Sequence, residues 1–388
     1  MASSFQKYPY PKLAVIGSGL IGSAAAKYLA EAGHDVTLIG PTEPEDKQNH
    51  TGVFGSHYDE GRITRAIDPS PFWAEVSLAS IERYRDLEAR SGIPFFSQVG
   101  ALVAGRTDHP DIQSIFDQIE GTTPPCAILD DAALAQTVPM FSFTPGTIGF
   151  YEADQAGHIS PRKLVAAQRK LAAAAGATLL NEEVLTLDAG DCATVTTALG
   201  KHEFDGVLLA TGGFARHLSP IDIPLTTYAR TIAFFEVDAE EAARLSGQPS
   251  LIYRFPDGRD PYLLPPITYP DGKTYLKIGG DPEDRVLTSQ AEINDWFRSG
   301  GNKDVAEFLT EMVMELMPDL KVRKVTHSSC VTSFTPDDRP MALAPYPSLF
   351  IVAGACGKGA KCSDELGRRA AMQVLAQAGV ASETEPAQ

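Results

Sequence analysis

The chain has few cysteines. Its 388 residues include five, scattered along the sequence and odd in number: Cys126, Cys192, Cys330, Cys356 and Cys362. No two of them have CxxC spacing, and none lies near histidines at metal-ligand spacing. We therefore expect neither a disulfide framework nor a metal site. This cysteine usage favours a reducing compartment, and we expect a cytoplasmic protein.

Long apolar runs and positive charge are also scarce. No stretch of about 18 apolar residues occurs, so no membrane span is expected. The first residues, MASSFQKYPYPK, lack the apolar core of a signal peptide. The 33 basic residues face 50 acidic ones, which gives a net charge of −17 and argues against nucleic acid or an anionic membrane as partner. The length suggests two domains, and the 43% of apolar residues is typical of folded proteins.

The most informative motif lies near the N-terminus. The stretch KLAVIGSGLIGSAAAKYLAEAGHDVTLIG predicts a buried strand at 13–17, a glycine-rich turn, a helix that ends at Gly33, and a second strand at 35–39. Gly17 permits the tight turn, Gly19 lets the backbone approach a pyrophosphate, and Gly22 lets the helix pack on the strand. With Leu20 and Ile21 in the same turn, this pattern predicts a dinucleotide site at a helix N-terminus. The alternative is a glycine-rich turn without a ligand.

One element of that motif is missing. A dinucleotide-binding unit usually ends its second strand with Asp or Glu, which holds a ribose hydroxyl. Here Gly40 stands at that position, in TLIGPTEPED. Thr42 or Glu43 could reach back in its place. The ribose contact is therefore open, whereas the phosphate site is not affected.

The next segment favours FAD over NAD, because a polar loop follows where a nicotinamide enzyme would repeat strand–helix units. That loop reads SHYDEGRITR and contains Ser56, Arg62 and Arg65. It resembles the Ser-His-His-Gly-Asp-Thr-Arg-Ile-Ile-Arg loop of the monomeric sarcosine oxidase and N-methyltryptophan oxidase family of FAD-dependent amine oxidases. Gly61 replaces the usual Thr of the family. The resemblance implies an FAD-binding domain of the Rossmann type.

The resemblance extends along most of the chain. GHISPRKLVAAQRKLAAAAGATLLNEEV is similar to the family's crossover helix and implies adenine contacts from Val184. FDGVLLATGGFARHL is similar to a strand that returns to the FAD at Gly212. CVTSFTPDDRPMALAPYPSLFIVAGACGKGAKCS resembles the pattern Cys-x-x-x-x-Thr-Pro-Asp, strand, Ala-Gly-x-x-Gly-x-Gly-x-Lys. We expect a helix from about Ser363 to point its N-terminus at the cofactor. The cofactor residues implied in this last segment are Cys330, Gly357, Lys358, Gly359 and Lys361.

The family pattern also implies roles in catalysis. Cys330 would carry a covalent thioether to the flavin, with a thiol packed beside noncovalent FAD as the alternative. Lys277, in KTYLKIGG, matches the lysine that activates oxygen, although an exposed strand lysine fits the alternating pattern equally well. Arg62 matches an arginine near the flavin. Arg65 and Lys361 match the pair that binds the substrate carboxylate.

Three further positions bear on the substrate. Tyr262 aligns loosely with a family tyrosine over the substrate. Asp281 stands where the family often has His. A carboxylate there would repel a substrate carboxylate, could pair with a basic substrate group, or could neutralise Lys277. Lys358 replaces a frequent family His, and its role is open.

We expect a mixed α/β protein of two interleaved domains. The FAD domain takes residues 1–95, 150–225 and 323–388. The substrate domain takes 96–149 and 226–322, with a mixed sheet built from runs such as TIAFFEV, SLIYRF and TYLKIGG. The expected function is oxidation of a secondary or N-methylated amino acid to an imine, with O2 reduced to H2O2. The alternatives are a dehydrogenase with another acceptor and a non-catalytic flavoprotein subunit. The expected partners are a small-molecule amine and O2, and the expected state is a monomer, with a dimer as the alternative.

Overall fold

The computed structural model describes residues 12–119 and 126–377. The N-terminal stretch in which no export signal is expected lies outside these residues. Among those described, no helix has both the length and the apolar character that crossing a bilayer requires.

A six-stranded sheet forms the first layer. Its strand order is β20-β21-β13-β1-β2-β9, and all neighbouring pairs are parallel except β20 with β21. The strands are β1 (Lys12–Ile16), β2 (Asp35–Ile39), β9 (Thr178–Leu180), β13 (Gly206–Leu209), β20 (Met341–Tyr346) and β21 (Leu349–Ala353). This confirms the expected Rossmann-type arrangement, in which strands far apart in the sequence lie side by side.

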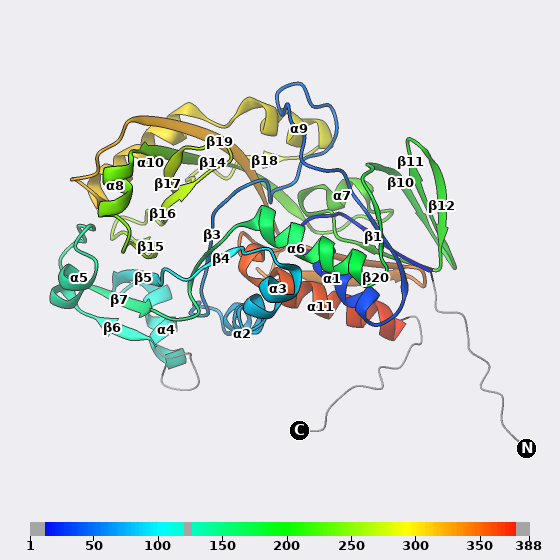
Figure 1. Ribbon diagram of the computed structural model, residues 1–388, viewed down its shortest axis with the longest axis horizontal. Coiled ribbons are helices and arrows are strands. Elements are labelled where there is room, and N and C mark those ends of the chain that lie inside the picture. The colour runs from blue at the N-terminus through cyan, green and yellow to red at the C-terminus, as the bar shows by residue number, and fades with distance from the viewer. Residues whose placement is uncertain (1–11, 120–125, 378–388) are drawn as a thin grey trace, which may run out of the picture.

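Each face of this sheet is covered differently. Three helices, α1 (Leu20–Glu31), α6 (Pro161–Ala174) and α11 (Gly359–Gln377), pack together on one face (Figure 1). The other face packs against a small antiparallel sheet of β10 (Val184–Ala189), β11 (Ala193–Thr197) and β12 (Gly200–Phe204), with the short helices η1 (Gly212–Phe214) and α7 (Ala215–Leu218) nearby. Helices α2 (Pro71–Ile81) and α3 (Tyr84–Ser91) pack against α11 and α6 respectively.

A nine-stranded mixed sheet forms the second large layer. Its order is β18-β14-β17-β16-β15-β5-β7-β6, and β19 pairs with β14. The strands are β5 (Ala101–Arg106), β6 (Ala127–Leu129), β7 (Thr147–Glu152), β14 (Thr226–Val237), β15 (Ser250–Arg254), β16 (Tyr262–Thr268), β17 (Thr274–Gly279), β18 (Val286–Leu287) and β19 (Lys324–Phe334). Its helices are α4 (Pro110–Ile119), α5 (Asp131–Thr137), α8 (Ala239–Arg244), α9 (Gln290–Ser299) and α10 (Lys303–Leu316).

Two of the expected borders cut through this sheet. Strand β19 pairs with β14 over its whole length, although the sequence assigned residues from 323 onward to the FAD domain. Strand β7 belongs to the same sheet and crosses the expected border at residue 150. A border placed by motif positions separates β19 from its sheet, because its partner β14 lies about a hundred residues earlier in the chain.

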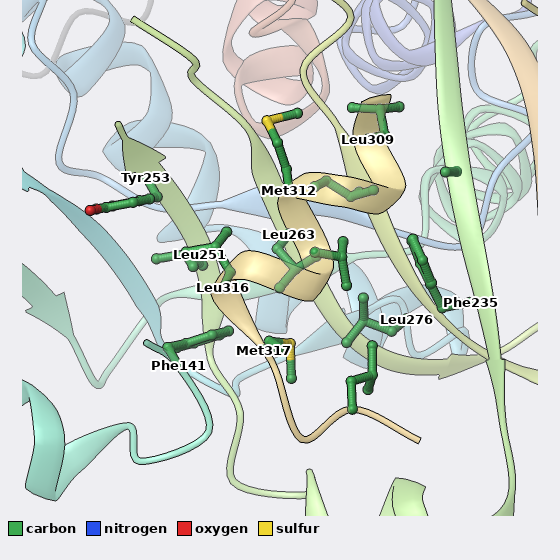
Figure 2. Packing of buried hydrophobic residues seen from close by; sticks show 14 of the residues in the cluster. Phe141, Phe235, Leu251, Tyr253, Leu263, Leu276, Leu309, Met312, Leu316 and Met317 are labelled. Carbon is green, nitrogen blue, oxygen red and sulfur yellow. The ribbon is translucent and has the colours of Figure 1, made fainter. Parts of the chain in front are cut away.

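The nine-stranded sheet has a packed face and a site face. Phe235 and Leu276 are paired neighbours on β14 and β17, and both belong to the core that helix α10 covers with Leu309, Met312 and Leu316 (Figure 2). The next pair along, Phe234 and Lys277, points the opposite way because side chains alternate along a strand. The alternation in TYLKIGG thus reflects two buried faces.

A fourth, small sheet contains the end of the loop SHYDEGRITR. It consists of β3 (Arg62–Thr64), β8 (Gly157–Ile159) and β4 (Phe96–Ser97). Strand β3 contains Arg62 and leads directly to Arg65. The segment 59–68 therefore holds charged residues at both ends of a short, paired strand.

Candidate active site

A cavity of about 380 Å³ opens where β1, β13 and β21 end. Ligands of open α/β sheets bind at this edge, beyond the carboxyl ends of the strands. The cavity has walls from the first, the middle and the last part of the chain. The predicted cofactor residues that line it are Gly17, Gly19, Leu20, Ile21, Ser56, Arg62, Val184, Gly212, Cys330, Gly357 and Gly359.

The glycine-rich turn has the geometry that the motif predicts. Gly17 has φ +109°, and a Cβ there would lie 2.4 Å from the Ala210 carbonyl oxygen. A Cβ on Gly22 would collide with the Gly17 carbonyl, so Gly22 keeps α1 close to the turn and does not itself line the cavity. Gly19 differs, because its Cβ would meet only His57 Nδ1 at 3.6 Å and its φ is −83°. The protein alone does not require glycine at 19, which is consistent with close approach of a ligand.

Buried polar atoms in this cavity also fit a nucleotide-sized ligand. Thr211 Oγ1, Thr332 Oγ1 and Glu182 Oε2 are shielded from solvent and have no hydrogen-bond partner among the described residues. All three residues line the cavity. Buried polar atoms in native proteins nearly always have partners. The cavity therefore has the unpartnered hydrogen-bond donors and acceptors, and the backbone without side chains at Gly19, that FAD binding requires.

The C-terminal turn meets the same cavity. Gly357 has φ +70°, and Gly357 and Gly359 both face the cavity. Helix α11 begins at Gly359, four residues earlier than expected, and Cys362 is buried inside it. Lys358 does not line the cavity: its ammonium is 2.9 Å from Asp338 Oδ2. The structure thus places Lys358 against the 335–339 turn and gives it no contact with the cofactor site.

Cys330 lies in the middle of strand β19, paired with Arg230 of β14. Its Sγ is 3.6 Å from Arg62 Nη2, and the residue is partly exposed to the cavity. A second cavity of about 220 Å³ adjoins the first and shares Cys330 and Arg62 with it. Its walls include the aromatic residues Phe234, Tyr269 and Phe297.

The first buried charge cluster, called here the site cluster because of the roles predicted for its members, consists of Arg65, Asp68 and Lys361, none of which lines either cavity. Lys361 Nζ is 2.8 Å and Arg65 Nη2 3.3 Å from Asp68 Oδ2. All three residues are buried, and Arg65 Nε and Nη1 have no hydrogen-bond partner among the described residues. Burial alone raises the pKa of Asp68, but the charges of Lys361 and Arg65 outweigh it and hold that pKa well below its usual range. Burial and the charge of Arg65 lower the pKa of Lys361, against the opposing effect of Asp68.

The second cluster, called here the lysine cluster, consists of Lys277, Asp59 and Arg62. Lys277 is fully buried, and its Nζ is 2.7 Å from Asp59 Oδ2. It also donates to the Gly61 carbonyl oxygen, and Arg62 pairs with the same Asp59 carboxylate. Burial lowers the pKa of Lys277 well below its ordinary value, and the charge of Arg62 acts in the same direction. Asp59 is the contact that favours the charged ammonium. The reading of Lys277 as an exposed strand residue is therefore wrong.

The structure also corrects the expected partner of Lys277. Asp281 does not pair with it, because Asp281 Oδ2 accepts from Thr231 N at 2.6 Å and Oδ1 from Glu283 N at 2.9 Å. The aligned tyrosine lies beside Lys277, whose Nζ is 5.7 Å from the ring centroid of Tyr262. A Cβ at Gly61 would lie 2.7 Å from Ile267 Cδ1 and 2.9 Å from Leu264 Cδ1, so the ends of these side chains would have to shift to admit the family threonine.

Several residues of the site were missed by sequence reasoning. Asp59 lies inside the motif SHYDEGRITR, where it takes the place of a family glycine, and that departure was the available clue. Thr211, Glu182 and Thr332 stand inside the stretches that resemble the family, but at positions to which the resemblance assigned no role, and Asp68 follows the loop that ends at Arg65. Within the described residues, no three His, Cys, Asp or Glu side chains are grouped in a way that could hold a metal ion.

The sheet, the glycine turn and the cavity define a flavin-dependent oxidoreductase of the Rossmann type. The family model "FAD dependent oxidoreductase" matches residues 12–373, and the chain belongs to this family. It is 26% identical to monomeric sarcosine oxidase from Arthrobacter sp. (strain TE1826), over 96% of this chain and 92% of that protein. It is 24% identical to N-methyl-L-tryptophan oxidase from Citrobacter koseri, over 92% and 93%. The structure is also similar to that of the fructosyl amine:oxygen oxidoreductase Amadoriase I from Aspergillus fumigatus, with a TM-score of 0.75, 18% identity, and coverage of 97% and 89%.

Proposed function

We propose that this protein oxidises a secondary or N-methylated amino acid to an imine, with O2 reduced to H2O2. Bound FAD would be the two-electron acceptor, and the protein would bind, orient and polarise the substrate. The observation that carries the proposal is the pair of free nitrogens on Arg65. Buried guanidinium nitrogens without partners are rare, and each of the two is a charged donor that a substrate carboxylate could satisfy.

The charges of the site cluster agree with an anionic substrate group. Arg65 and Lys361 are two cations, and Asp68 is one anion between them. Glu152 lies near, where its carboxylate accepts from the backbone amides of Ala66 and Ile67, and burial raises its pKa despite the opposing charge of Arg65. The formal charges of Arg65, Lys361 and Asp68 sum to one positive charge. A substrate carboxylate would neutralise this charge and accept from Arg65 Nε or Nη1.

The amine of such a substrate must lose its proton before the carbon beside it can be oxidised. We expect the reductive half-reaction to accelerate as pH rises and the ammonium form is depleted. Because Asp281 is held by the backbone of Thr231 and Glu283, we assign it no substrate contact. Tyr262, beside Lys277, is proposed to pack over the substrate.

The oxygen reaction would depend on Lys277. A fixed positive charge stabilises the negative charge that develops on oxygen. Lys277, however, is paired with Asp59, so part of its charge is compensated. This observation favours a second candidate, a dehydrogenase that passes its electrons to another acceptor. Comparing the rate of H2O2 formation with the rate of reduction of an artificial electron acceptor distinguishes the oxidase from the dehydrogenase.

We further propose that Cys330 binds the flavin covalently, because its thiol borders the cavity beside Arg62. Joining Sγ to the 8α-methyl carbon would release two protons and two electrons, and O2 would be the final acceptor of these electrons. Acid-precipitated protein should give a yellow pellet. Cys330→Ala should release the colour into the supernatant, and a colourless wild-type pellet would contradict the proposal.

The test of the proposed function is anaerobic flavin reduction with a matched substrate panel. The panel pairs N-methyl and cyclic amino acids with the same amines lacking the carboxylate. We expect the carboxylate forms to be preferred by about 30-fold or more, the effect of one charge-assisted contact in a desolvated site. Equal rates for both members of each pair would remove the proposed function.

The domain organisation, the oligomeric state and the cellular location are also proposals, and the domain borders differ from those expected from the sequence. We propose two interleaved units: an FAD unit on the six-stranded sheet and a substrate unit on the nine-stranded sheet, to which β7 and β19 belong. We also propose, from composition, that the protein is a monomer and that it is located in the cytoplasm. Size-exclusion chromatography with light scattering tests the oligomeric state, and fractionation of the producing cell tests the location.

A further inference from the structure

The adenosine end of the cavity lacks the acidic residue that usually ends β2, and the structure explains why. A Cβ on Gly40 would lie 2.6 Å from the backbone nitrogen of Ser18 and 2.7 Å from Ser18 Cβ. Ser18 is buried, and its hydroxyl accepts a hydrogen bond from Arg169. Ser18 cannot move aside without breaking that contact. Any side chain at position 40 is therefore excluded by the glycine-rich turn itself.

The neighbouring strand brings a carboxylate to the same place. Strand β9 pairs in parallel with β2, and the Gly40 amide donates to the Leu180 carbonyl oxygen at 3.0 Å. The chain beyond β9 is therefore adjacent to the end of β2. Glu182 lies two residues past that contact and lines the cavity together with Gly40 and Pro41. Its Oε2 is shielded from solvent and has no hydrogen-bond partner among the described residues.

The residues on either side of Glu182 are engaged elsewhere. Glu183 Oε2 accepts from Val53 N at 3.1 Å, and its Oε1 accepts from Gln290 Nε2 at 3.2 Å. Asn181 Oδ1 accepts from Arg169 Nη2 at 2.7 Å. These contacts hold the segment 181–183 against the glycine-rich turn and the 50–53 loop. Of its two carboxylates, only that of Glu182 keeps a buried acceptor oxygen free.

We propose that Glu182 binds the ribose hydroxyls of the adenosine half of FAD, in place of the missing residue at the end of β2. An ionised carboxylate only accepts hydrogen bonds, and a ribose diol offers two hydroxyl donors. A buried carboxylate oxygen without a donor is destabilising, so the site is complete only with such a ligand. The inference rests on the FAD dependence of the family and not on the identity of the amine.

The test measures affinity and needs no turnover. In the Cys330→Ala background, in which any flavin is held noncovalently, the apoprotein is titrated with FAD, with FMN, and with an FAD analogue carrying 2′,3′-dideoxyadenosine. Glu182→Gln should weaken FAD binding about 10- to 100-fold, the range for a hydrogen bond to a charged group. It should leave the affinities for FMN and for the dideoxy analogue unchanged, because neither contains the diol.

Controls separate binding from folding. Glu203→Gln changes the same residue type on the exposed surface of β12 and should alter none of the three affinities. Glu182→Ala gives a second variant, and thermal unfolding of each apoprotein reports whether the fold is retained. Unchanged FAD affinity in Glu182→Gln, or an equal loss for the dideoxy analogue, would overturn the proposal. Either result would leave the proposed amine oxidation intact, since that depends on Arg65 and Lys277.

Discussion

Helix α11 contributes to two buried charge clusters, through Lys361 and, one turn later, through Asp364. They differ in whether all of their charged groups have partners within the protein. Asp364 accepts from Lys27 Nζ at 2.6 Å, from Arg83 Nε at 2.6 Å and from Tyr28 Oη at 2.8 Å. We call this group the interface cluster. In the site cluster, Lys361 is equally buried, but Arg65 keeps two nitrogens unpaired. A closed cluster holds helices together, whereas the open one leaves donors for the substrate carboxylate that we propose as its ligand.

The position of the interface cluster explains why it is closed. Lys27 belongs to α1, and α1 packs tightly on α11 because a Cβ on Gly367 would lie 2.4 Å from Ala24 Cβ. No ligand-sized space exists between helices in such contact. Every charge buried there therefore needs a partner within the protein.

The largest expected effect breaks the interface cluster. Asp364→Ala leaves the Lys27 ammonium buried without its carboxylate, and we expect a loss of about 3–5 kcal/mol in the free energy of unfolding. Arg65→Met is the matched change in the site cluster and should alter stability by less than about 1 kcal/mol, since two of its three nitrogens lack partners and Asp68 keeps its shorter contact with Lys361. Urea denaturation of both variants measures the difference. Equal losses would mean that both clusters are structural.

The second effect concerns the lysine cluster. Lys277→Met should slow reoxidation of the reduced protein by about 10²-fold, corresponding to about 3 kcal/mol of lost charge stabilisation. Anaerobic reduction by substrate should change much less. Stopped-flow measurement of both half-reactions tests this, with Lys273→Met, an exposed lysine that precedes the same strand, as control. Unchanged reoxidation would favour the dehydrogenase.

The third effect sharpens the contrast between open and closed clusters. Arg65→Met should weaken carboxylate inhibitors by about 2–4 kcal/mol, or about 30- to 1000-fold. Equilibrium titration of flavin absorbance with an inhibitor measures it. The same inhibitors should bind normally to Lys273→Met. A loss that is equal for inhibitors without a carboxylate would point to a general disturbance of the site.

The smallest effect is a change in pH dependence. Burial lowers the pKa of Lys277, and the contact with the Asp59 carboxylate favours its charged form. In Asp59→Asn the lysine should lose its proton at a lower pH, so oxygen reactivity should fall more steeply as pH rises. Wild type should fall less over the same pH range. Asp281→Asn, whose carboxylate is bound elsewhere, should behave as wild type. A flat profile in Asp59→Asn would contradict the assigned role.

Much of the fold was predictable because its determinants are local. The glycine turn, the helix that stops before Gly33 and the last parallel strand follow from short patterns, and the structure has all three. The membership of β19 was not predictable in this way. Its pairing with β14 depends on residues about a hundred positions away, and no local pattern records such a register.

In the candidate site, too, residues inside local motifs were predictable, whereas their partners from distant parts of the chain were not. Family positions gave Arg65, Lys361, Lys277 and Cys330, because those residues stand inside recognisable motifs. The sequence could not give the partners that decide their charge. Asp68 and Asp59 act through distances of 2.7–2.8 Å to residues far away in the chain, and Asp281, which is nearer to Lys277 in sequence, turns toward backbone amides.

The strand order of the six-stranded sheet also bears on how the protein is made. Strand β1 is complete within the first 16 residues, but its neighbour β13 comes at residues 206–209, and β21 follows only at 349–353. At about 5–20 residues per second, roughly 15–60 s of synthesis separate the glycine turn from the strand that completes the cavity. During that time the apolar edge of β1 is available to wrong partners. We therefore expect the nascent chain to depend on chaperones, and to take up FAD only after the ribosome has added β21 and the glycine-containing turn that follows it.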